Sequence, residues 1–277
     1  MAVIVRPMTT RDVAPAAAML RRGDWGDREG FFAWAVDHPA CRPYVADDDG
    51  RLVATGVATA NGTVGWVGTI FVDAERRGSG LGAALTRTVV DDLEGRGCRT
   101  LVLIATRAGR PIYERQGFEV LEQQVHLSIG GLPEGPDPAA VRRFEPPDLP
   151  GVLALDATAT GEDRSALLAG LVAPETTRVA TGPGGHVEGF VVRASWGGAA
   201  LIAADPAAAL RLFEWRRRRA GPDGRVAVGL MASNETGQRL LRAAGWTEHG
   251  GAVRMIRGDP LVWRPDWLWG QFNGALG

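Results

Sequence analysis

A glycine-rich turn that follows an apolar run constrains the fold of this chain more than any other feature. Residues 64–72 predict a buried strand and residues 83–93 predict a helix, and between them stands Arg77-Gly78-Ser79-Gly80-Leu81-Gly82. Glycine lets the backbone turn sharply and approach an anion closely. The free N–H groups of a first helical turn then bind phosphate. The turn lacks the Lys-Ser/Thr ending of a P-loop and matches a dinucleotide fingerprint only in part.

A second motif follows at the expected distance along the chain. Residues 100–106 predict another buried strand, and a short helix then carries Tyr113 and ends at Gly117-Phe118. This order of strand, glycine turn, helix, strand and Tyr-helix resembles the GCN5-related N-acetyltransferase (GNAT) superfamily over residues 3–130. The resemblance implies a mixed α/β (α+β) sheet, acetyl-CoA as acyl donor with no metal, and direct transfer of the acetyl group to a primary amine.

The chain repeats this pattern. Its 277 residues suggest two domains, and the Gly/Pro-rich residues 131–140 predict a linker. Beyond the linker, Asp148 heads a helix as Asp12 does, and Gly245-Trp246 repeats Gly117-Phe118. The sequence therefore predicts two tandem GNAT-like domains, 1–130 and 141–277. The string from Ala105 to Phe118 resembles a bacterial tandem subgroup of the superfamily.

The second copy is degenerate where chemistry is expected. Residues 203–208 replace the glycine turn, contain no glycine, and place Asp205 where a phosphate would lie. Leu241 stands at the position of Tyr113. We therefore expect the first domain to bind acetyl-CoA and the second to form a wall of the acceptor site. The tail tryptophans Trp263, Trp267 and Trp269 either line the acceptor pocket or dock the tail.

The resemblance also implies the site residues. The cofactor-binding candidates are Ile70, Phe71, Val72, Arg77, Gly78, Ser79, Gly80, Leu81, Gly82 and Ala83. Tyr113 is the candidate general acid, since a phenol has a pKa close to that of the thiolate leaving group; alternatively its ring packs on the cofactor. The general base is open between a water relay and the candidates Asp27, Glu29, Asp37, His38 and Asp73, each of which is also a plausible surface or turn residue.

Other charged residues have two interpretations each. Asp156, Glu162 and Asp163 could bind a cationic acceptor, although Asp163 equally suits a helix cap. The run Arg216–Arg219 predicts a solvated helix end rather than a nucleic-acid site. A net charge of −1 and an isoelectric point near 6.4 favour neither a nucleic-acid nor a membrane partner.

The remaining composition bounds the setting. Only Cys41 and Cys98 are present, which excludes a disulfide framework or a zinc site and favours a reducing, cytoplasmic compartment. All 31 basic residues are arginine, which is typical of a GC-rich bacterial genome. The acceptor, the acyl-chain length and the oligomeric state, a homodimer included, stay open. The alternatives to a small-molecule acetyltransferase are an acyl-CoA-binding module without turnover and a protein N-terminal or lysine acetyltransferase.

Overall fold

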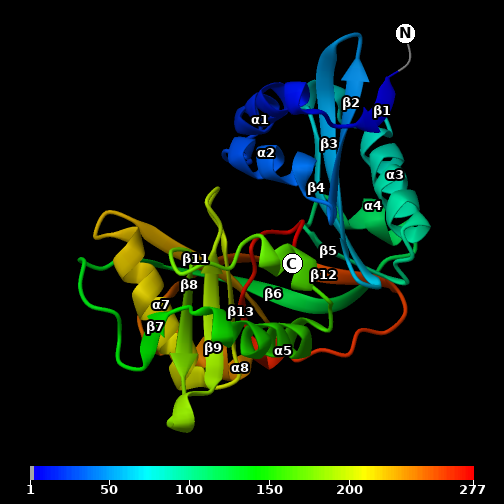
Figure 1. Ribbon diagram of the computed structural model, residues 1–277. Helices are drawn as coiled ribbons and strands as arrows, with labels where there is room; N and C mark the ends of the chain where they lie inside the picture. Colours follow the sequence, from blue (N-terminus) through cyan, green and yellow to red (C-terminus); the bar gives the residue numbers. More distant parts are fainter. Residues whose placement is uncertain (1–2) are drawn as a thin grey trace. The chain divides into compact units, whose positions relative to one another are not determined.

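The computed structural model describes residues 3–277 and divides into two units, each built from discontinuous segments of the chain (Figure 1). The first unit comprises Met1–Glu119, Met255–Pro260 and Gly274–Leu276. The second unit comprises Val120–Arg254, Leu261–Asn273 and Gly277. Each unit is therefore completed by segments that lie far from its main part in the sequence.

The first unit contains the elements expected of residues 3–130, up to the start of β6. Its strands are β1 Ile4–Pro7, β2 Cys41–Asp48, β3 Arg51–Asn61, β4 Val64–Val72 and β5 Thr100–Ala105. Its helices are η1 Thr10–Asp12, α1 Val13–Arg22, α2 Glu29–Asp37, η2 Ala74–Arg76, α3 Leu81–Gly95 and α4 Arg110–Glu114. The strand predicted at residues 64–72 is confirmed with the same bounds.

The first-unit sheet has the strand order β1-β2-β3-β4-β5. Neighbouring strands are antiparallel except β4 and β5, which are parallel. Helices α1 and α2 cover one face and α3 the other (Figure 1). On the far side of β5 from β4, the end of β12 (Thr247–Gly258) completes the unit. The residue after β12 is also bonded here: Asp259 N–H donates to Arg99 O at 3.1 Å, and Thr100 Oγ1 donates to Asp259 O at 3.0 Å.

The second unit holds one five-stranded antiparallel sheet in the order β13-β10-β9-β8-β7. These strands are β7 Val141–Arg143, β8 Thr177–Thr181, β9 Val187–Arg193, β10 Ala199–Ala203 and β13 Leu268–Gly270. In the same unit, β6 (Glu119–Gly130) lies between β12 and β11 (Arg225–Met231). Its helices are η3 Pro146–Asp148, α5 Leu149–Thr160, α6 Ser165–Ala169, η4 Pro183–Gly185, α7 Pro206–Ala220, α8 Glu235–Ala243 and η5 Pro265–Trp267. One face of α7 packs into the core through Leu212, Phe213 and Trp215.

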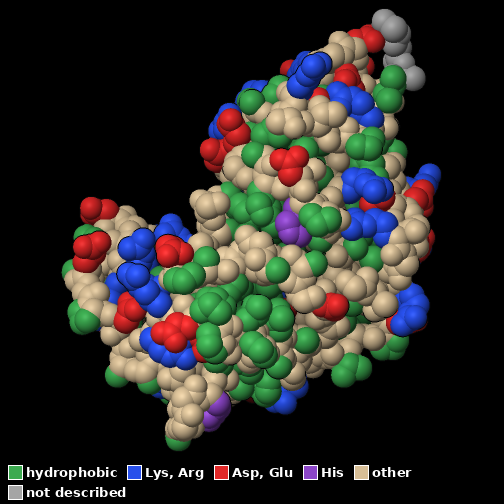
Figure 2. All heavy atoms as spheres, viewed as in Figure 1, with side chains coloured by type: hydrophobic (Ala, Val, Ile, Leu, Met, Phe, Trp, Pro, Cys, Tyr) green, Lys and Arg blue, Asp and Glu red, His purple; other side chains and the backbone are tan. Residues whose placement is uncertain are grey.

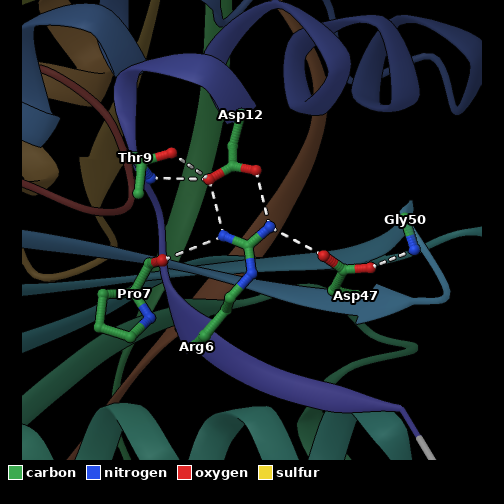
Figure 3. Close-up of polar contacts among 6 residues, drawn as sticks. All are labelled: Arg6, Pro7, Thr9, Asp12, Asp47 and Gly50. Carbon is green, nitrogen blue, oxygen red and sulfur yellow. Dashed lines mark hydrogen bonds and ion pairs between the residues drawn. The ribbon is translucent and has the colours of Figure 1, made fainter.

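The internal repeat is visible in the polar contacts that open each half. In the first unit, Arg6 binds the Asp12 carboxylate with both guanidinium nitrogens, at 2.7 and 2.9 Å, and Thr9 N–H donates to the same carboxylate (Figure 3). In the second unit, Arg142 binds Asp148 with two bonds of 2.7 Å, and Glu145 N–H donates to it. Both aspartates are N-cap residues, of α1 and α5. The repeat predicted from Asp12 and Asp148 is thus confirmed.

Candidate active site

Strand β4 leads into the glycine turn and carries a bulge at its centre. Thr69 has a φ of +51°, and the register against β3 shifts between Thr55 and Val57 at this point. Thr55 Oγ1 donates to Thr69 O at 3.0 Å and holds the bulge. A bulge re-aims the residues that follow it, which here are Ile70, Phe71 and Val72.

The parallel pairing of β4 with β5 is short. It runs from Val64, opposite Thr100, to Trp66, opposite Val102, although β4 continues to Val72. The β5-facing edge of the second half of β4 is therefore not paired with β5. An extended group can add to such an edge through backbone hydrogen bonds.

The segment Gly274–Leu276 lies against both strands just beyond this point. A Cβ atom on Gly68 of β4 would lie 2.2 Å from the Cα of Ala275, and one on Gly274 would lie 3.7 Å from Ile104 Cβ of β5. Ala275 and Leu276 are both buried. Glycine at position 68 is therefore required for the segment to approach β4 this closely.

The glycine turn itself is open. Residues Arg77–Gly80 are exposed, and Gly78 and Gly80 have φ values of +79° and +81° with nothing within 4 Å of a Cβ placed on either. These two positions need glycine for backbone conformation rather than for space. The turn is held from within, because Ser79 Oγ donates to Arg76 O at 2.7 Å and Arg77 Nε donates to Val72 O at 3.2 Å.

Helix α3 begins without a side-chain cap. Gly80 is its N-cap residue, no side chain within residues 3–277 caps it, and its first intrahelical bond at this end runs from Ala84 N–H to Gly80 O. The N–H groups of the residues before Ala84, in the first turn of α3, therefore have no acceptor within the helix. Such N–H groups, together with the helix dipole, are able to bind an anion. The predicted residues Gly80, Leu81, Gly82 and Ala83 all lie in this turn.

The equivalent helix of the second unit is closed. Helix α7 has Asp205 as its N-cap, and the Asp205 carboxylate accepts a 2.9 Å hydrogen bond from Ala208 N–H. Pro206 removes one further donor from the first turn. A side-chain anion thus already occupies the position that α3 leaves open, as the sequence predicted for Asp205.

Tyr113 lies on α4, next to the first turn of α3. Gln116 Nε2 donates to Ala83 O at 3.2 Å, and Ile112 Cδ1 lies 3.6 Å from a Cβ placed on Gly82. The Tyr113 ring is buried edge-on against Phe118, with centroids 6.2 Å apart. Burial raises the pKa of the Tyr113 phenol to about 12. The phenol therefore stays protonated at neutral and mildly basic pH and can act only as a proton donor there.

The five candidate bases occupy surface or capping positions. Asp73 caps η2 through Glu75 N–H and pairs with Arg22 and Arg51; although burial opposes it, these contacts hold the pKa of its carboxyl below the ordinary value. Asp27 accepts from Glu29 N–H, which lowers its pKa together with Arg21.

The other three candidates have similar settings. Glu29 pairs with Arg21, and Asp37 is the exposed last residue of α2. His38 stacks on Trp34 at 4.3 Å and accepts a hydrogen bond from Ala40 N–H through Nδ1. Neither Asp27 nor Asp73 carries the raised carboxylate pKa that is the usual sign of a poised base.

The acidic group of the second unit does not bind an external cation. Asp156 forms two hydrogen bonds with Arg164, and Glu162 pairs with Arg254 at 3.3 Å. All four side chains are at most 2% exposed. The interpretation of Asp156 and Glu162 as an acceptor site is therefore wrong, because both carboxylates are buried against arginines. Asp163 accepts hydrogen bonds from Ser165 N–H and Ser165 Oγ just before α6, whereas the N-cap residue of that helix is Arg164 and no side chain caps it.

The tail tryptophans differ in their environment. Trp269 is 1% exposed, packs edge-on against Phe213, and donates from Nε1 to Ala203 O at 3.1 Å. It is a core residue of the second unit and docks β13. Arg254 lies over the Trp263 ring at 4.3 Å and Arg264 over the Trp267 ring at 4.7 Å.

Sequence reasoning missed a histidine pair in the second unit. The rings of His126 on β6 and His249 on β12 lie 6.1 Å apart, and His126 Nε2 hydrogen-bonds Gln124 at 3.1 Å. Burial, and then His249, lower the pKa of His126, so its imidazole is neutral at physiological pH. The alternation of Gln124 and His126 along β6, which puts both on one face, was the available signal.

Figure 2 shows arginines interspersed with acidic side chains on the face in view. Among residues 3–277 no three His, Cys, Asp or Glu side chains are placed to hold a metal ion. Within the same described part, no helix combines the length and hydropathy needed to cross a bilayer.

Solved structures share the fold along nearly the whole chain. A Pyrococcus horikoshii structure superimposes with a TM-score of 0.83 at 19% identity, covering 99% of this chain and 96% of that one. A GCN5-related N-acetyltransferase from Sphaerobacter thermophilus gives 0.64 at 19% identity over 92% and 95%. A tandem GNAT protein from the clavulanic acid biosynthesis pathway gives 0.62 at 14% identity over 94% and 99%. At these identities the similarity shows the fold alone.

Curated relatives match parts of the sequence. Glucosamine 6-phosphate N-acetyltransferase 1 of Oryza sativa subsp. japonica is 34% identical over 110 residues, which are 36% of this chain and 64% of that enzyme. The mycothiol acetyltransferase of Thermobifida fusca is 35% identical over 119 residues, which are 40% of this chain and 34% of that enzyme. The chain thus spans less than two thirds of the length of each of these relatives.

Family profiles match both halves of the chain. A profile described as "Acetyltransferase (GNAT) family" matches residues 12–118, and one described as "Acetyltransferase (GNAT) domain" matches residues 152–270. The two matches follow the repeat seen in sequence and structure. The chain therefore belongs to the GNAT acetyltransferases and carries two domains of that family in tandem.

Proposed function

We propose that the first unit binds acetyl-CoA at the N-terminus of α3 and transfers the acetyl group to a primary amine of a small molecule. The observation that carries this proposal is the contrast between two equivalent helices. Helix α3 begins at Gly80 with an open first turn, whereas α7 is capped by Asp205. An open helix N-terminus in one repeat and a capped one in the other fit one cofactor per chain.

The residues of the first unit fit the donor substrate. The open turn Arg77–Ala83 would receive the pyrophosphate, because Gly78 and Gly80 leave the approach to the backbone clear. The edge of β4 from the bulge at Thr69 to Val72 would pair with the amides of the pantetheine arm. The same fit serves the rival reading, an acyl-CoA-binding module without turnover.

Tyr113 favours turnover over simple binding. Acetyl-CoA supplies an activated acetyl group as a thioester, and its transfer forms a C–N bond and breaks a C–S bond. A backbone N–H near Phe71 or Val72 would polarise the carbonyl. The buried phenol of Tyr113 is protonated at neutral pH and would give its proton to the departing sulfur, although its raised pKa of about 12 makes it a weaker acid than a free phenol. The amine would lose its proton to water, since the pKa values of the candidate bases Asp27 and Asp73 are lowered rather than raised.

The acceptor class rests on the relatives. Their names include glucosamine 6-phosphate and mycothiol acetyltransferases, so a small amine such as an amino sugar is the first choice. An amino acid or a polyamine is the next. A protein N-terminus or a lysine side chain is the alternative acceptor, and it belongs in the same screen.

The division of labour between the repeats is part of the proposal. Residues 1–130 would bind the donor and carry the chemistry, residues 131–140 would act as a linker, and residues 141–277 would shape the acceptor site. The closed N-terminus of α7 supports this division because the second repeat keeps its fold without an anion site.

The test is an acceptor screen that follows the release of free CoA, run with Tyr113→Phe and a matched control. Tyr113→Phe keeps the ring and removes the hydroxyl, and turnover should fall by roughly 10²–10⁴-fold with little change in acetyl-CoA affinity. Tyr44→Phe alters the chain's only other tyrosine, on β2, and should leave turnover unchanged. Binding of acetyl-CoA without CoA release for any acceptor would favour the binding module.

A further inference from the structure

The second unit contains a cavity whose charged residues are all arginine. Its volume is about 170 Å³, and it lies between the β9–β10 turn, the end of α7 and the start of β11. Four arginines line it: Arg193, Arg216, Arg219 and Arg225. Trp215 and the turn at Gly197 and Gly198 complete the wall, and no acidic residue is among the lining residues.

Arg216 departs from the solvated helix end that its sequence predicts. Although the residue as a whole is only partly buried, its Nη1 is out of contact with solvent and hydrogen-bonds nothing in the described part of the chain. Its guanidinium lies over the Phe213 ring at 5.9 Å, and Nη1 lies beside Gly270. Sequence periodicity placed Leu212 and Trp215 inside, and Arg216 follows the buried Phe213 by three residues on α7, so it lies on the same side of the helix.

The positive charge of this cavity is not offset by the chain. None of the four arginines forms an ion pair with any residue of 3–277. Arg225 instead donates to Ser128 Oγ. Burial, and repulsion from Arg193, lower the pKa of Arg216 to about 10, so it is still charged at neutral pH. A buried cation without a partner is costly, and an anion in the cavity would remove that cost.

Two other cavities of the same unit show the ordinary arrangement. One combines Arg211 with Glu188 and Asp205. The other combines Arg178, Arg218 and Arg219 with Glu134 and Asp137, so Arg219 borders both this cavity and the one at Arg216. In both, the chain supplies carboxylates beside its arginines. The cavity at Arg216 differs because only a molecule from outside can supply the negative charge.

We propose that this cavity is a binding site for a phosphate group, either free phosphate or the phosphate of a small phosphorylated metabolite. Arginine forks match the oxygens of phosphate in pairs, and four of them suit a doubly charged anion better than a single carboxylate. The volume of about 170 Å³ is nearly six times the ~30 Å³ that a water occupies in the liquid, which is enough for a phosphate group. The site lies away from the N-terminus of α7, so it is not the phosphate turn of the second repeat.

The proposal is tested by calorimetric titration of the full chain with inorganic phosphate at pH 7.5 and constant ionic strength. The key variant is Arg216→Met, which keeps an unbranched stem and removes the charge. Arg193→Gln removes a second charge at an exposed position, so it does not depend on the core. The control is Arg239→Met, which removes an exposed arginine from α8 of the same unit.

We expect wild type and Arg239→Met to bind phosphate with the same Kd, and Arg216→Met and Arg193→Gln to bind at least tenfold more weakly. Without phosphate, Arg216→Met should melt at the wild-type temperature or above, because the variant no longer buries an unpaired charge. Phosphate that binds at α3 would be insensitive to Arg216, which keeps this test separate from the proposed function. Two results would overturn the proposal. One is an equal Kd for phosphate in wild type and Arg216→Met. The other is no binding by wild type when phosphate is in 20-fold excess over protein sites and is raised to about 20 mM.

A second titration identifies the source of the phosphate. Glucose 6-phosphate that binds more tightly than inorganic phosphate, and with the same dependence on Arg216, would assign the site to a phosphorylated metabolite. Tighter binding of inorganic phosphate would assign it to the free ion.

Discussion

Replacing Gly80 by aspartate and, separately, by asparagine isolates the role of charge at the start of α3. Both side chains tolerate a positive φ better than other residues do, so the backbone cost at +81° is nearly shared. Both enter open space, since no atom lies within 4 Å of a Cβ at this position. The two variants then differ only in one negative charge.

The size of the effect follows from exposure. Arg77–Gly80 are exposed, so the water-like limit applies, and two unit charges 4 Å apart interact by about 1 kcal/mol. If two charges of the pyrophosphate lie near the new aspartate, their repulsion weakens the binding free energy of CoA by about 2 kcal/mol. This corresponds to a Kd about 30-fold weaker. The negative charge of the same aspartate also interacts favourably with the positive end of the helix dipole, which stabilises the folded protein by about 0.3–1 kcal/mol. Gly80→Asp should therefore be slightly more stable than Gly80→Asn while it binds CoA far more weakly.

The assay is calorimetry with CoA, together with urea unfolding of each variant. Gly95→Ala is the control, because it lies at the other end of α3, its φ is ordinary and nothing lies within 4 Å of its Cβ. It should bind CoA with nearly the wild-type Kd. If the aspartate and asparagine variants bind CoA within about threefold of each other, the N-terminus of α3 is not where the pyrophosphate binds.

Three further outcomes test other features. Acetyl-CoA should bind with a stoichiometry of one per chain by calorimetry, because Asp205 already caps α7; two sites would contradict this. Asp12→Asn should lower the free energy of unfolding at pH 7 by about 1.5–3 kcal/mol, since the carboxylate holds Arg6.

The contacts with Arg6 hold the pKa of Asp12 below its ordinary 3.8. The stability that Asp12 contributes is therefore present above about pH 4 and is lost as the pH falls toward the lower folded-state pKa. A stability difference between wild type and Asp12→Asn as large at pH 2 as at pH 7 would argue against this.

Gly68→Ala should destabilise the first unit by about 1–3 kcal/mol, because its Cβ would lie 2.2 Å from Ala275 Cα. Gly95→Ala has nothing within 4 Å of its Cβ and should not destabilise the unit. Equal melting temperatures of the two variants would refute the contact.

Local patterns in the sequence predicted most of the first unit. The apolar run of β4, the glycines of the turn and the Gly117-Phe118 ending are short-range signals, and each led to the right element. The cap at Asp205 was predictable for the same reason, since its partner Ala208 is three residues away.

Long-range pairing was not predictable in this way. The alternation along β6 and β12 indicates strands but not their neighbours, so the sequence did not reveal that Met255–Pro260 belong to the first unit. The pairs Asp156–Arg164 and Glu162–Arg254 were also missed. Charged residues are usually exposed, and only a partner brought in by the fold makes their burial tolerable.

The segments Met255–Pro260 and Gly274–Leu276 have a consequence for how the protein is made. On the ribosome, residues up to Glu119 emerge first, yet the edge of β5 and the space beside Gly68 stay unfilled until those late segments have been synthesised. An unpaired strand edge is a template for pairing with other chains. Fast translation through the second half, or a chaperone that shields β5, should therefore raise the yield of folded protein, and a fragment ending near residue 131 is not equivalent to the first unit.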